Sequence, residues 1–219
     1  MDIFEEAQYY VGNVGPDYFK VGSLQLELLK ENGLVPSSHV LEIGCGCLAA
    51  GRPILHFLGP DHYVGIEPNY WLIEAVIEGL PGTKDLIDEK RPVFLRRTDF
   101  DATSVGRRFD FIISHSILSH AAHWQCPQFF KGVKKVLAPS GVALASIRFH
   151  DQDNSLMGDS LSPEWVYPDV SHFAWETVQK FAAAEQLCVE WRKDYREFFT
   201  KELPSNYHDW IRLRHTQSL

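Results

Sequence analysis

The apolar residues of the chain fall into short runs that alternate with stretches of helical spacing. Seven runs have the length and the branched or aromatic residues that are typical of buried strands. They are residues 39–43, 63–66, 92–97, 109–114, 142–147, 187–191 and 210–213. Because strands that alternate with helices pack as a sheet with helical cover, this order predicts an α/β fold with parallel βαβ crossovers.

Helix boundaries follow from Pro, Gly and capping residues between these runs. Residues 23–32 place leucines on one helical face, and Gly33 then provides a C-terminal stop. Pro53 predicts a helix start near Gly51 or Arg52, since proline is tolerated in the first helical turn. Three further helices are expected: one capped by Asn69, one behind Pro127 that carries Phe129, Phe130, Val133, Val136 and Leu137, and one from Ser171 through Ala184.

Length and composition favour a single folded domain over residues 1–219. The chain has 219 residues, of which 45% are hydrophobic, so one sizeable core is the default. Residues 1–38 form a helical lead-in, and residues 139–141, Pro-Ser-Gly, predict a turn before the fifth strand. Residues 150–171 are rich in Asp, Asn, Ser, Gly and Pro, and a segment of this length predicts a lid or substrate loop.

Charge and cysteine content narrow the expected setting and partners. The net charge of −8 gives no overall reason to bind a phosphate backbone, and the paired basic residues at 96–97, 107–108 and 134–135 are expected to be solvated surface. No run approaches the about 18 apolar residues that cross a bilayer. The four cysteines do not form a disulfide framework. With an acidic start in place of a secretion signal, we expect a cytoplasmic protein.

Candidate chemistry begins where the first two predicted strands end. Glu42, Gly44 and Gly46 form a Glu-x-Gly-x-Gly loop, which brings bare backbone close to a ligand. Glu67 ends the next strand 21 positions after Gly46, where a carboxylate can accept hydrogen bonds from both hydroxyls of a ribose. After the third strand, Asp99 can accept from an adenine amine while Phe100 borders the ring. Together these residues predict a nucleoside pocket.

Four motifs in this order resemble the class I, Rossmann-like S-adenosylmethionine-dependent methyltransferases. They are Leu-Glu-Ile-Gly-Cys-Gly at 41–46, Gly-Ile-Glu-Pro-Asn at 65–69, Asp-Phe at 99–100 and Phe-Asp-Phe-Ile-Ile-Ser at 109–114. The turn at 139–141 is similar to the family's Pro-Gly-Gly, with Ser140 in place of the first glycine. The resemblance implies a doubly wound, mostly parallel seven-stranded sheet with an antiparallel last strand and helices on both faces.

The resemblance also implies a cofactor, S-adenosylmethionine, with S-adenosylhomocysteine as product. Gly44 and Gly46 then line the methionine portion, Glu67 the ribose, and Asp99 with Phe100 the adenine. Glu42 faces the amino-acid end, and Arg52 is placed to meet the cofactor carboxylate. Within the same motifs, the remaining cofactor-binding candidates are Cys45, Pro68, Asn69 and Ser114.

The expected reaction is in-line methyl transfer to an O or N nucleophile of a small-molecule acceptor. Because the sulfonium already activates its methyl group, alignment is the main contribution of the protein. A hydroxyl acceptor also needs a base, and histidine has the pKa nearest neutrality. His115 directly follows the fourth strand and His120 lies five positions on, so these are the catalytic candidates. Trp165 and Tyr167 in the lid segment favour a partly apolar or ring-bearing acceptor.

Other interpretations of the same residues stay open. A binding module without catalysis would keep Glu67 and Asp99, and an NAD(P)-dependent oxidoreductase would share the first two motifs. The oxidoreductase is disfavoured because Ala49 stands where the third fingerprint glycine belongs. A metal site is disfavoured because Cys45 and Cys47 have no second ligand pair at a familiar spacing. Residues 18–20, Tyr-Phe-Lys, either cover the cofactor or anchor the first helix.

Overall fold

The strands form one seven-stranded sheet with the order β3-β2-β1-β4-β5-β7-β6 in a computed structural model that describes residues 2–150 and 159–216. β1 pairs in parallel with β2, β2 with β3, and β4 with β5, whereas β7 is antiparallel to both β5 and β6. This topology confirms the predicted Rossmann-like sheet with its antiparallel last strand. The chain divides into two compact units, Met1–Thr98 and Asp99–Leu219. Whether they behave as the single predicted domain stays a prediction.

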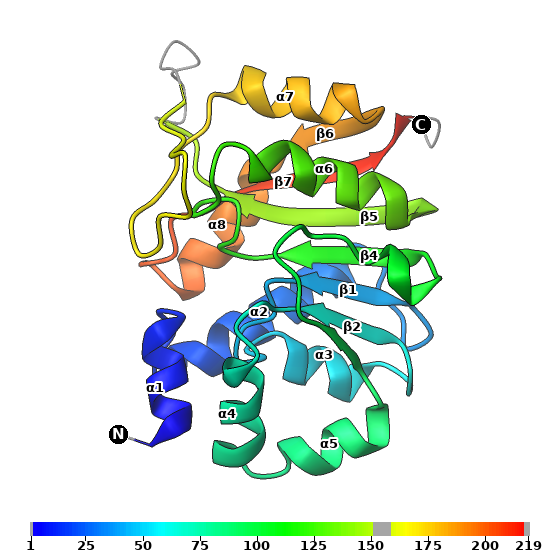
Figure 1. Ribbon diagram of the computed structural model, residues 1–219, viewed down its shortest axis with the longest axis vertical. Helices are drawn as coiled ribbons and strands as arrows, with labels where there is room; N and C mark the ends of the chain where they lie inside the picture. Colours follow the sequence, from blue (N-terminus) through cyan, green and yellow to red (C-terminus); the bar gives the residue numbers. More distant parts are fainter. Residues whose placement is uncertain (1, 151–158, 217–219) are drawn as a thin grey trace. The chain divides into compact units, whose positions relative to one another are not determined.

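The first unit carries the three strands on one side of the sheet and five helices. α1 packs against α4, and α2 packs against α3. Figure 1 shows α1, α2 and α4 in this unit in blue to blue-green. Its elements in chain order are α1 (Ile3–Tyr10), α2 (Pro16–Glu31), β1 (Val40–Ile43), α3 (Gly51–Phe57), β2 (Tyr63–Ile66), α4 (Trp71–Gly79), α5 (Thr83–Lys90) and β3 (Val93–Leu95).

The helical predictions in this unit are partly wrong. The predicted helix of residues 23–32 begins seven residues earlier, because Pro16 occupies the first helical turn after Gly15, whose φ is 59°. α3 begins at Gly51, as Pro53 predicts. Asn69 does not cap α4: the N-cap is Tyr70, and the Asn69 amide donates instead to the Tyr10 hydroxyl at 3.4 Å. α5 is absent from the prediction because its sequence has few apolar residues.

The second unit carries the other four strands, and its helices α6 and α7 lie side by side over β5, β6 and β7 (Figure 1). α8 packs against β7. The elements are a 3₁₀ turn (Thr103–Val105), β4 (Phe109–Ser114), α6 (Gln125–Val136), β5 (Leu137–Ile147), α7 (Trp175–Ala184), β6 (Leu187–Trp191), α8 (Lys193–Glu202) and β7 (Asp209–His215).

Two expectations for the second unit need correction, and one helix was not predicted. The turn at 139–141 is an irregularity within β5: the pairing with β4 shifts register between Phe109 and Phe111. Ser171 does not cap α7, because its buried hydroxyl donates to the Ala121 carbonyl at 3.2 Å. The N-cap residue is Ala174, which makes no side-chain cap hydrogen bond, and Asp159 accepts from the Ala174 N–H at 2.6 Å and from the Thr177 hydroxyl at 2.7 Å. The sequence of α8 is itself polar, and its pattern does not predict a helix.

The predicted lid lies partly outside the described residues, which omit 151–158. The described remainder runs along residues 119–123, and its backbone is bonded there at three points. Val166 N–H donates to His120 O at 3.0 Å, Ser171 N–H to Ser119 O at 2.6 Å, and His123 N–H to Ser162 O at 2.7 Å. Lid function stays a prediction.

Candidate active site

Glu67 joins the ends of the first two strands in the first unit. Its carboxylate leaves the end of β2 and accepts the Gly46 N–H at 3.0 Å through Oε2. Oε1 accepts the Asn69 N–H at 2.8 Å. Burial raises the pKa of Glu67, and the two N–H donors oppose that shift. Each oxygen uses one lone-pair direction on the protein, so a second direction on each remains for a ligand hydroxyl.

The glycine loop is shaped by backbone conformations that glycine favours. Gly44 and Gly46 have φ angles of 77° and 49°, in the left-handed region. The N–H groups of Gly44 and Cys45 both donate to the Ile66 carbonyl, at 2.8 and 3.1 Å. The sequence motif therefore folds as predicted: a sharp turn after β1, tied to the end of β2, with bare backbone beside the Glu67 carboxylate.

Glu42 lies beneath this loop and is 5% exposed. It accepts a 2.5 Å hydrogen bond from the Tyr63 hydroxyl. Burial raises the pKa of Glu42 to about 8, although the Tyr63 hydrogen bond opposes the shift. The carboxyl therefore favours its protonated form in the protein alone, and its predicted place at the amino-acid end of a cofactor stays a prediction.

Arg52 in α3 has incomplete hydrogen bonding. One Nη donates to the Pro81 carbonyl at 3.4 Å, whereas the buried Nε has no partner among the described residues. An unpaired guanidinium N–H fits the predicted meeting with a ligand carboxylate. Cys45 is buried, and Pro68 accepts a 3.3 Å hydrogen bond from Arg96 Nε through its carbonyl.

α1 adds residues that sequence reasoning missed. Val11 directly follows α1, and a Cβ built at Gly46 would lie 3.4 Å from its Cγ1. Tyr10 packs edge-on against Trp71, with ring centroids 5.4 Å apart. Tyr18 is buried, and its hydroxyl donates to the Cys47 carbonyl at 2.7 Å. The segment 18–20 therefore anchors α2 to the glycine loop through Tyr18. The paired tyrosines at 9–10 were the sequence feature that could have indicated the contact of α1 with α4.

Asp99 and Phe100 begin the second unit, and only Asp99 is exposed. Asp99 accepts the Asp101 N–H at 3.3 Å. Phe100 is 6% exposed and packs edge-on against Phe129, with ring centroids 5.9 Å apart. The ring is thus part of the core of this unit, so the geometry gives no support to its predicted place beside an adenine. That role, like that of Asp99, stays a prediction.

His120 forms a directed pair with Ser116, a residue that the sequence did not single out. His120 Nδ1 lies 2.7 Å from the Asp169 carbonyl, which only accepts, so Nδ1 carries the hydrogen. Its Nε2 then accepts from the Ser116 hydroxyl at 3.1 Å. Ser116 has a φ of 60°, an uncommon conformation for serine, and its N–H donates to Ser146 Oγ at 2.6 Å. The loop after β4 thus holds an oriented Ser–His pair.

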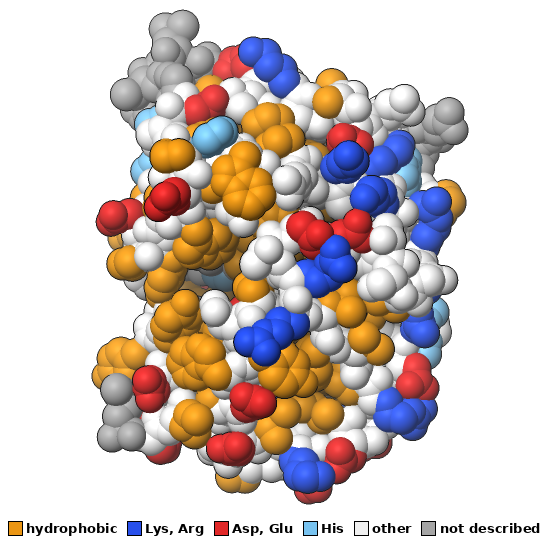
Figure 2. Space-filling view, viewed as in Figure 1, with side chains coloured by type: hydrophobic (Ala, Val, Ile, Leu, Met, Phe, Trp, Pro, Cys, Tyr) orange, Lys and Arg blue, Asp and Glu red, His pale blue; other side chains and the backbone are white. Residues whose placement is uncertain are grey.

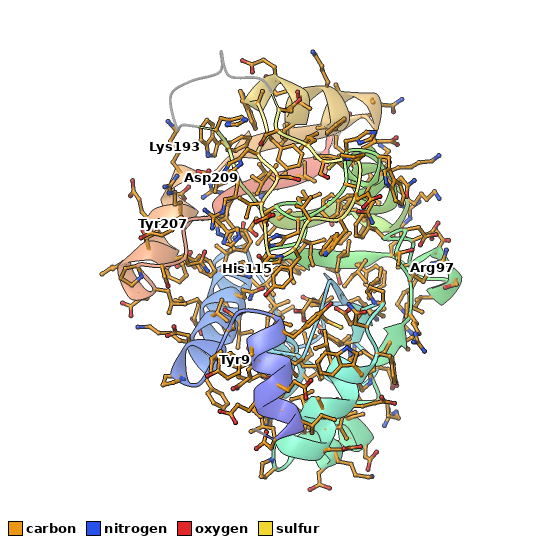
Figure 3. All side chains as sticks on the ribbon, turned by 60° about the vertical axis from the view of Figure 1, so that its left-hand side comes forward. Tyr9, Arg97, His115, Lys193, Tyr207 and Asp209 are labelled. Carbon is orange, nitrogen blue, oxygen red and sulfur yellow. The ribbon has the colours of Figure 1, made fainter. Side chains whose placement is uncertain are left out.

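His115 belongs to a second chain of hydrogen bonds. The Asn206 amide nitrogen lies 3.2 Å from His115 Nε2, and the Asn206 oxygen lies 2.8 Å from His208 Nδ1. An amide nitrogen donates and an amide oxygen accepts, so His115 Nε2 is an acceptor and His208 Nδ1 carries a hydrogen. Figure 3 labels His115 and Tyr207, the neighbour of His208, in this unit. Nothing in the sequence pattern pointed to Asn206 or His208.

All three histidines favour the neutral form. Burial lowers the pKa of His115 to about 4 and that of His208 well below its usual value. Burial also lowers the pKa of His120, with a further contribution from the charge of Arg148. At neutral pH the His120 pair can therefore take up a proton, whereas the His115 lone pair is already used by Asn206. Ser114 is buried, and its hydroxyl has no partner among the described residues.

The structure thus brings the predicted residues together in two groups. In the first unit the glycine loop, Glu67 and Asn69 are joined by hydrogen bonds. In the second unit His115 and His120 each sit in a separate network after β4. Across the described ranges, no three side chains of His, Cys, Asp or Glu are arranged to hold a metal ion.

The described helices and surface add two observations. None of these helices combines the length and apolar character needed to cross a membrane. Figure 2 shows Lys and Arg side chains interleaved with Asp and Glu on the face that it draws. Over the coloured part of that face, charge of one sign does not form a continuous field.

Comparison with known proteins agrees with this fold. Residues 41–143 match a family model described as a methyltransferase domain. The glycopeptide N-methyltransferase MtfA, in complex with S-adenosyl-L-methionine, has 12% identity and a TM-score of 0.65, covering 89% of this chain and 94% of its own. DesVI of Streptomyces venezuelae has 13% identity and a TM-score of 0.64, with coverage of 96% and 97%. No curated protein has a significantly similar sequence.

A third similar structure is magnesium protoporphyrin IX methyltransferase (ChlM) from Synechocystis PCC 6803 with bound SAM. It has 12% identity and a TM-score of 0.60, and the match covers 90% of this chain and 81% of that one. At such identities the likeness concerns the fold. The chain therefore has the Rossmann-like fold of these methyltransferases, and the methyltransferase-domain match spans residues 41–143 of it.

Proposed function

We propose that the protein binds S-adenosylmethionine on its first unit and transfers the methyl group to an N or O nucleophile of a small molecule. The observation that carries the proposal is the Glu67 carboxylate, which accepts Gly46 N–H and Asn69 N–H and keeps one acceptor direction free on each oxygen. Two adjacent acceptors fit two adjacent ribose hydroxyls. The unpaired Arg52 Nε supports a carboxylate at the amino-acid end of the same ligand.

When bound, the sulfonium supplies an activated methyl group: the methyl–sulfur bond breaks as the bond to the acceptor forms, and sulfur keeps the electron pair. The residues of this chain then position the reactants and manage one proton. His120 Nε2 accepts the Ser116 hydrogen, so Ser116 Oγ can accept the acceptor's proton as its own hydrogen moves to His120. Asp169 O holds the protonated imidazole through Nδ1.

We assign the base from the different hydrogen bonds that His120 and His115 make through Nε2. His120 presents its Nε2 lone pair to a hydroxyl, whereas the His115 lone pair faces a donor from Asn206. We therefore assign proton uptake to the Ser116–His120 pair. His115 serves as a hydrogen-bond donor through Nδ1, in place of the base that the sequence predicts. Trp165 and Tyr167 lie near the His120 ring, with centroids 6.1 and 4.9 Å away, and favour a ring-bearing acceptor.

Cofactor binding by Glu67→Ala tests the proposal. We expect the affinity for S-adenosylhomocysteine, measured by calorimetry, to fall about 10- to 100-fold, because two charge-assisted hydrogen bonds are lost. Glu74→Ala, which removes an exposed acid of α4 in the same unit, should bind like the wild type. Equal affinities in the wild type and Glu67→Ala would refute the site.

Turnover separates the enzyme from a binding module. A panel of small amines and alcohols is offered with S-adenosylmethionine, and formation of S-adenosylhomocysteine is followed. His120→Gln should lower turnover of a hydroxyl acceptor about 10²-fold or more while leaving cofactor affinity unchanged. His56→Gln, at an exposed position of α3, is the matched control. Wild-type turnover by His120→Gln would show that His120 is not the base.

A further inference from the structure

Arg148 immediately follows β5, and its Nε is buried without a hydrogen-bond partner among the described residues. It differs from the two other arginines of the second unit that have such a nitrogen. Arg192 and Arg212 share this feature, but each has a carboxylate partner, Asp194 and Glu190 respectively. Arg148 itself is partly buried. A covered guanidinium N–H without an acceptor is costly unless a ligand supplies one.

The nearby acid, Asp209, makes its hydrogen bonds to groups other than Arg148. Asp209 is 3% exposed at the start of β7. One of its oxygens accepts from Arg196 at 3.2 Å, and the other accepts the Phe149 N–H at 3.2 Å. Asp209 thus pairs directly with Arg196 and with the backbone after β5, and its interaction with Arg148 is electrostatic without a hydrogen bond. Figure 3 shows Asp209 in the second unit, which also carries His115.

Among the described residues, the other charged and titratable groups around Arg148 add no negative charge. Its electrostatic neighbours besides Asp209 are Arg196, His120, His172 and His208. The backbone is fixed, because the Arg148 carbonyl accepts the Phe173 N–H at 2.9 Å. Arg148 follows the carboxyl end of a parallel strand, where α/β sheets bind their ligands, and the Ser116–His120 loop follows the neighbouring strand β4 at the same edge.

We propose that Arg148 binds an oxyanion, a carboxylate or phosphate carried by the methyl acceptor. The acceptor would then be an anionic small molecule whose nucleophile lies toward the Ser116–His120 pair. This inference rests on the proposed methyl transfer, but the anion site itself belongs to the second unit alone. A planar guanidinium suits two-pronged recognition of either oxyanion.

The test uses sodium benzoate and sodium phosphate as probes, titrated into the full chain at constant ionic strength. We expect saturable, millimolar binding of at least one probe by NMR, and the two arms identify whether carboxylate or phosphate fits. Binding should raise the pKa of His120 and His208, because the anion offsets the charge of Arg148. Arg148→Gln should weaken binding about tenfold or more, and Arg148→Lys should retain part of it.

Arg214→Gln is the matched control: Arg214 lies on β7 five residues beyond Asp209, about 16 Å along the strand. It should bind the probes like the wild type. Equal affinity in Arg148→Gln and the wild type, or no saturable binding of either probe in the millimolar range, would overturn the inference. Calorimetry with S-adenosylhomocysteine on the same samples keeps the cases apart, because loss of anion binding with intact cofactor binding leaves the proposed function standing.

Discussion

At the scale of single residues, hydrogen-bond direction decides the chemistry more than residue type does. His115 and His120 both follow β4, yet only His120 presents a lone pair to a hydroxyl. The sequence identifies both histidines and favours His115, because its position directly after a strand is visible in one dimension. Ser116, Asn206 and His208 were not predicted: their roles depend on contacts made across as many as 91 positions.

The protonation states of these histidines give a first prediction. His120 should titrate below its ordinary value of about 6.5, and His115 near pH 4, because burial disfavours the imidazolium form. Ring-proton NMR of the wild type against His115→Gln and His120→Gln assigns the two resonances. Titration of both rings near 6.5 would mean that neither is buried as described, and proton uptake by the Ser116–His120 pair would lose its basis.

At the scale of elements, α2 packs directly against the segment that follows the glycine loop. Gly22 lies against this segment so closely that a Cβ there would be 1.8 Å from the Ala49 carbonyl oxygen. The sequence predicted the strands around the loop to within a few residues, since buried runs of branched residues are local signals. It missed α5 and α8, whose polar sequences become helical through packing against α3, α4 and β7.

A second prediction concerns this contact. Gly22→Ala should force α2 away from the loop and destabilise the protein by about 1–3 kcal/mol or more. At about 2–4 °C per kcal/mol, the loss is measurable as a lower Tm. S-adenosylhomocysteine affinity should fall in parallel, because the loop carries Gly46. Ser23→Ala, next in the same helix and exposed, should change neither. An unaltered Tm for Gly22→Ala would contradict the close approach.

At the scale of the whole molecule, buried groups whose pKa values shift in opposite directions make the free energy of unfolding depend on pH. The folded pKa of His115 is depressed, so the unfolded chain binds more protons between about pH 4 and 6.5, and stability falls as pH drops through that window. The folded pKa of Glu42 is raised, so the folded chain binds more protons between about 4.5 and 8, and stability falls as pH rises there.

The third prediction isolates Glu42 above pH 6.5, where the unfolded histidines are largely neutral. The Tm of the wild type should decrease from pH 6.5 to 8 as the buried carboxyl ionises. Glu42→Gln, which keeps an acceptor for the Tyr63 hydroxyl, should lack most of this decrease. Glu74→Gln, an exposed change, should follow the wild type. A wild-type decrease that Glu42→Gln reproduces in full would assign the pH dependence to another group.

Ligand selection by the intact protein tests the central claim most directly. Purified wild-type chain is titrated by calorimetry with S-adenosylmethionine, S-adenosylhomocysteine and NAD. We expect one-to-one binding of the first two ligands and none of NAD, because Glu67 offers a carboxylate to the ribose and the glycine loop offers bare backbone without the third fingerprint glycine. Binding of NAD alone, or of none of the three, would contradict the claim.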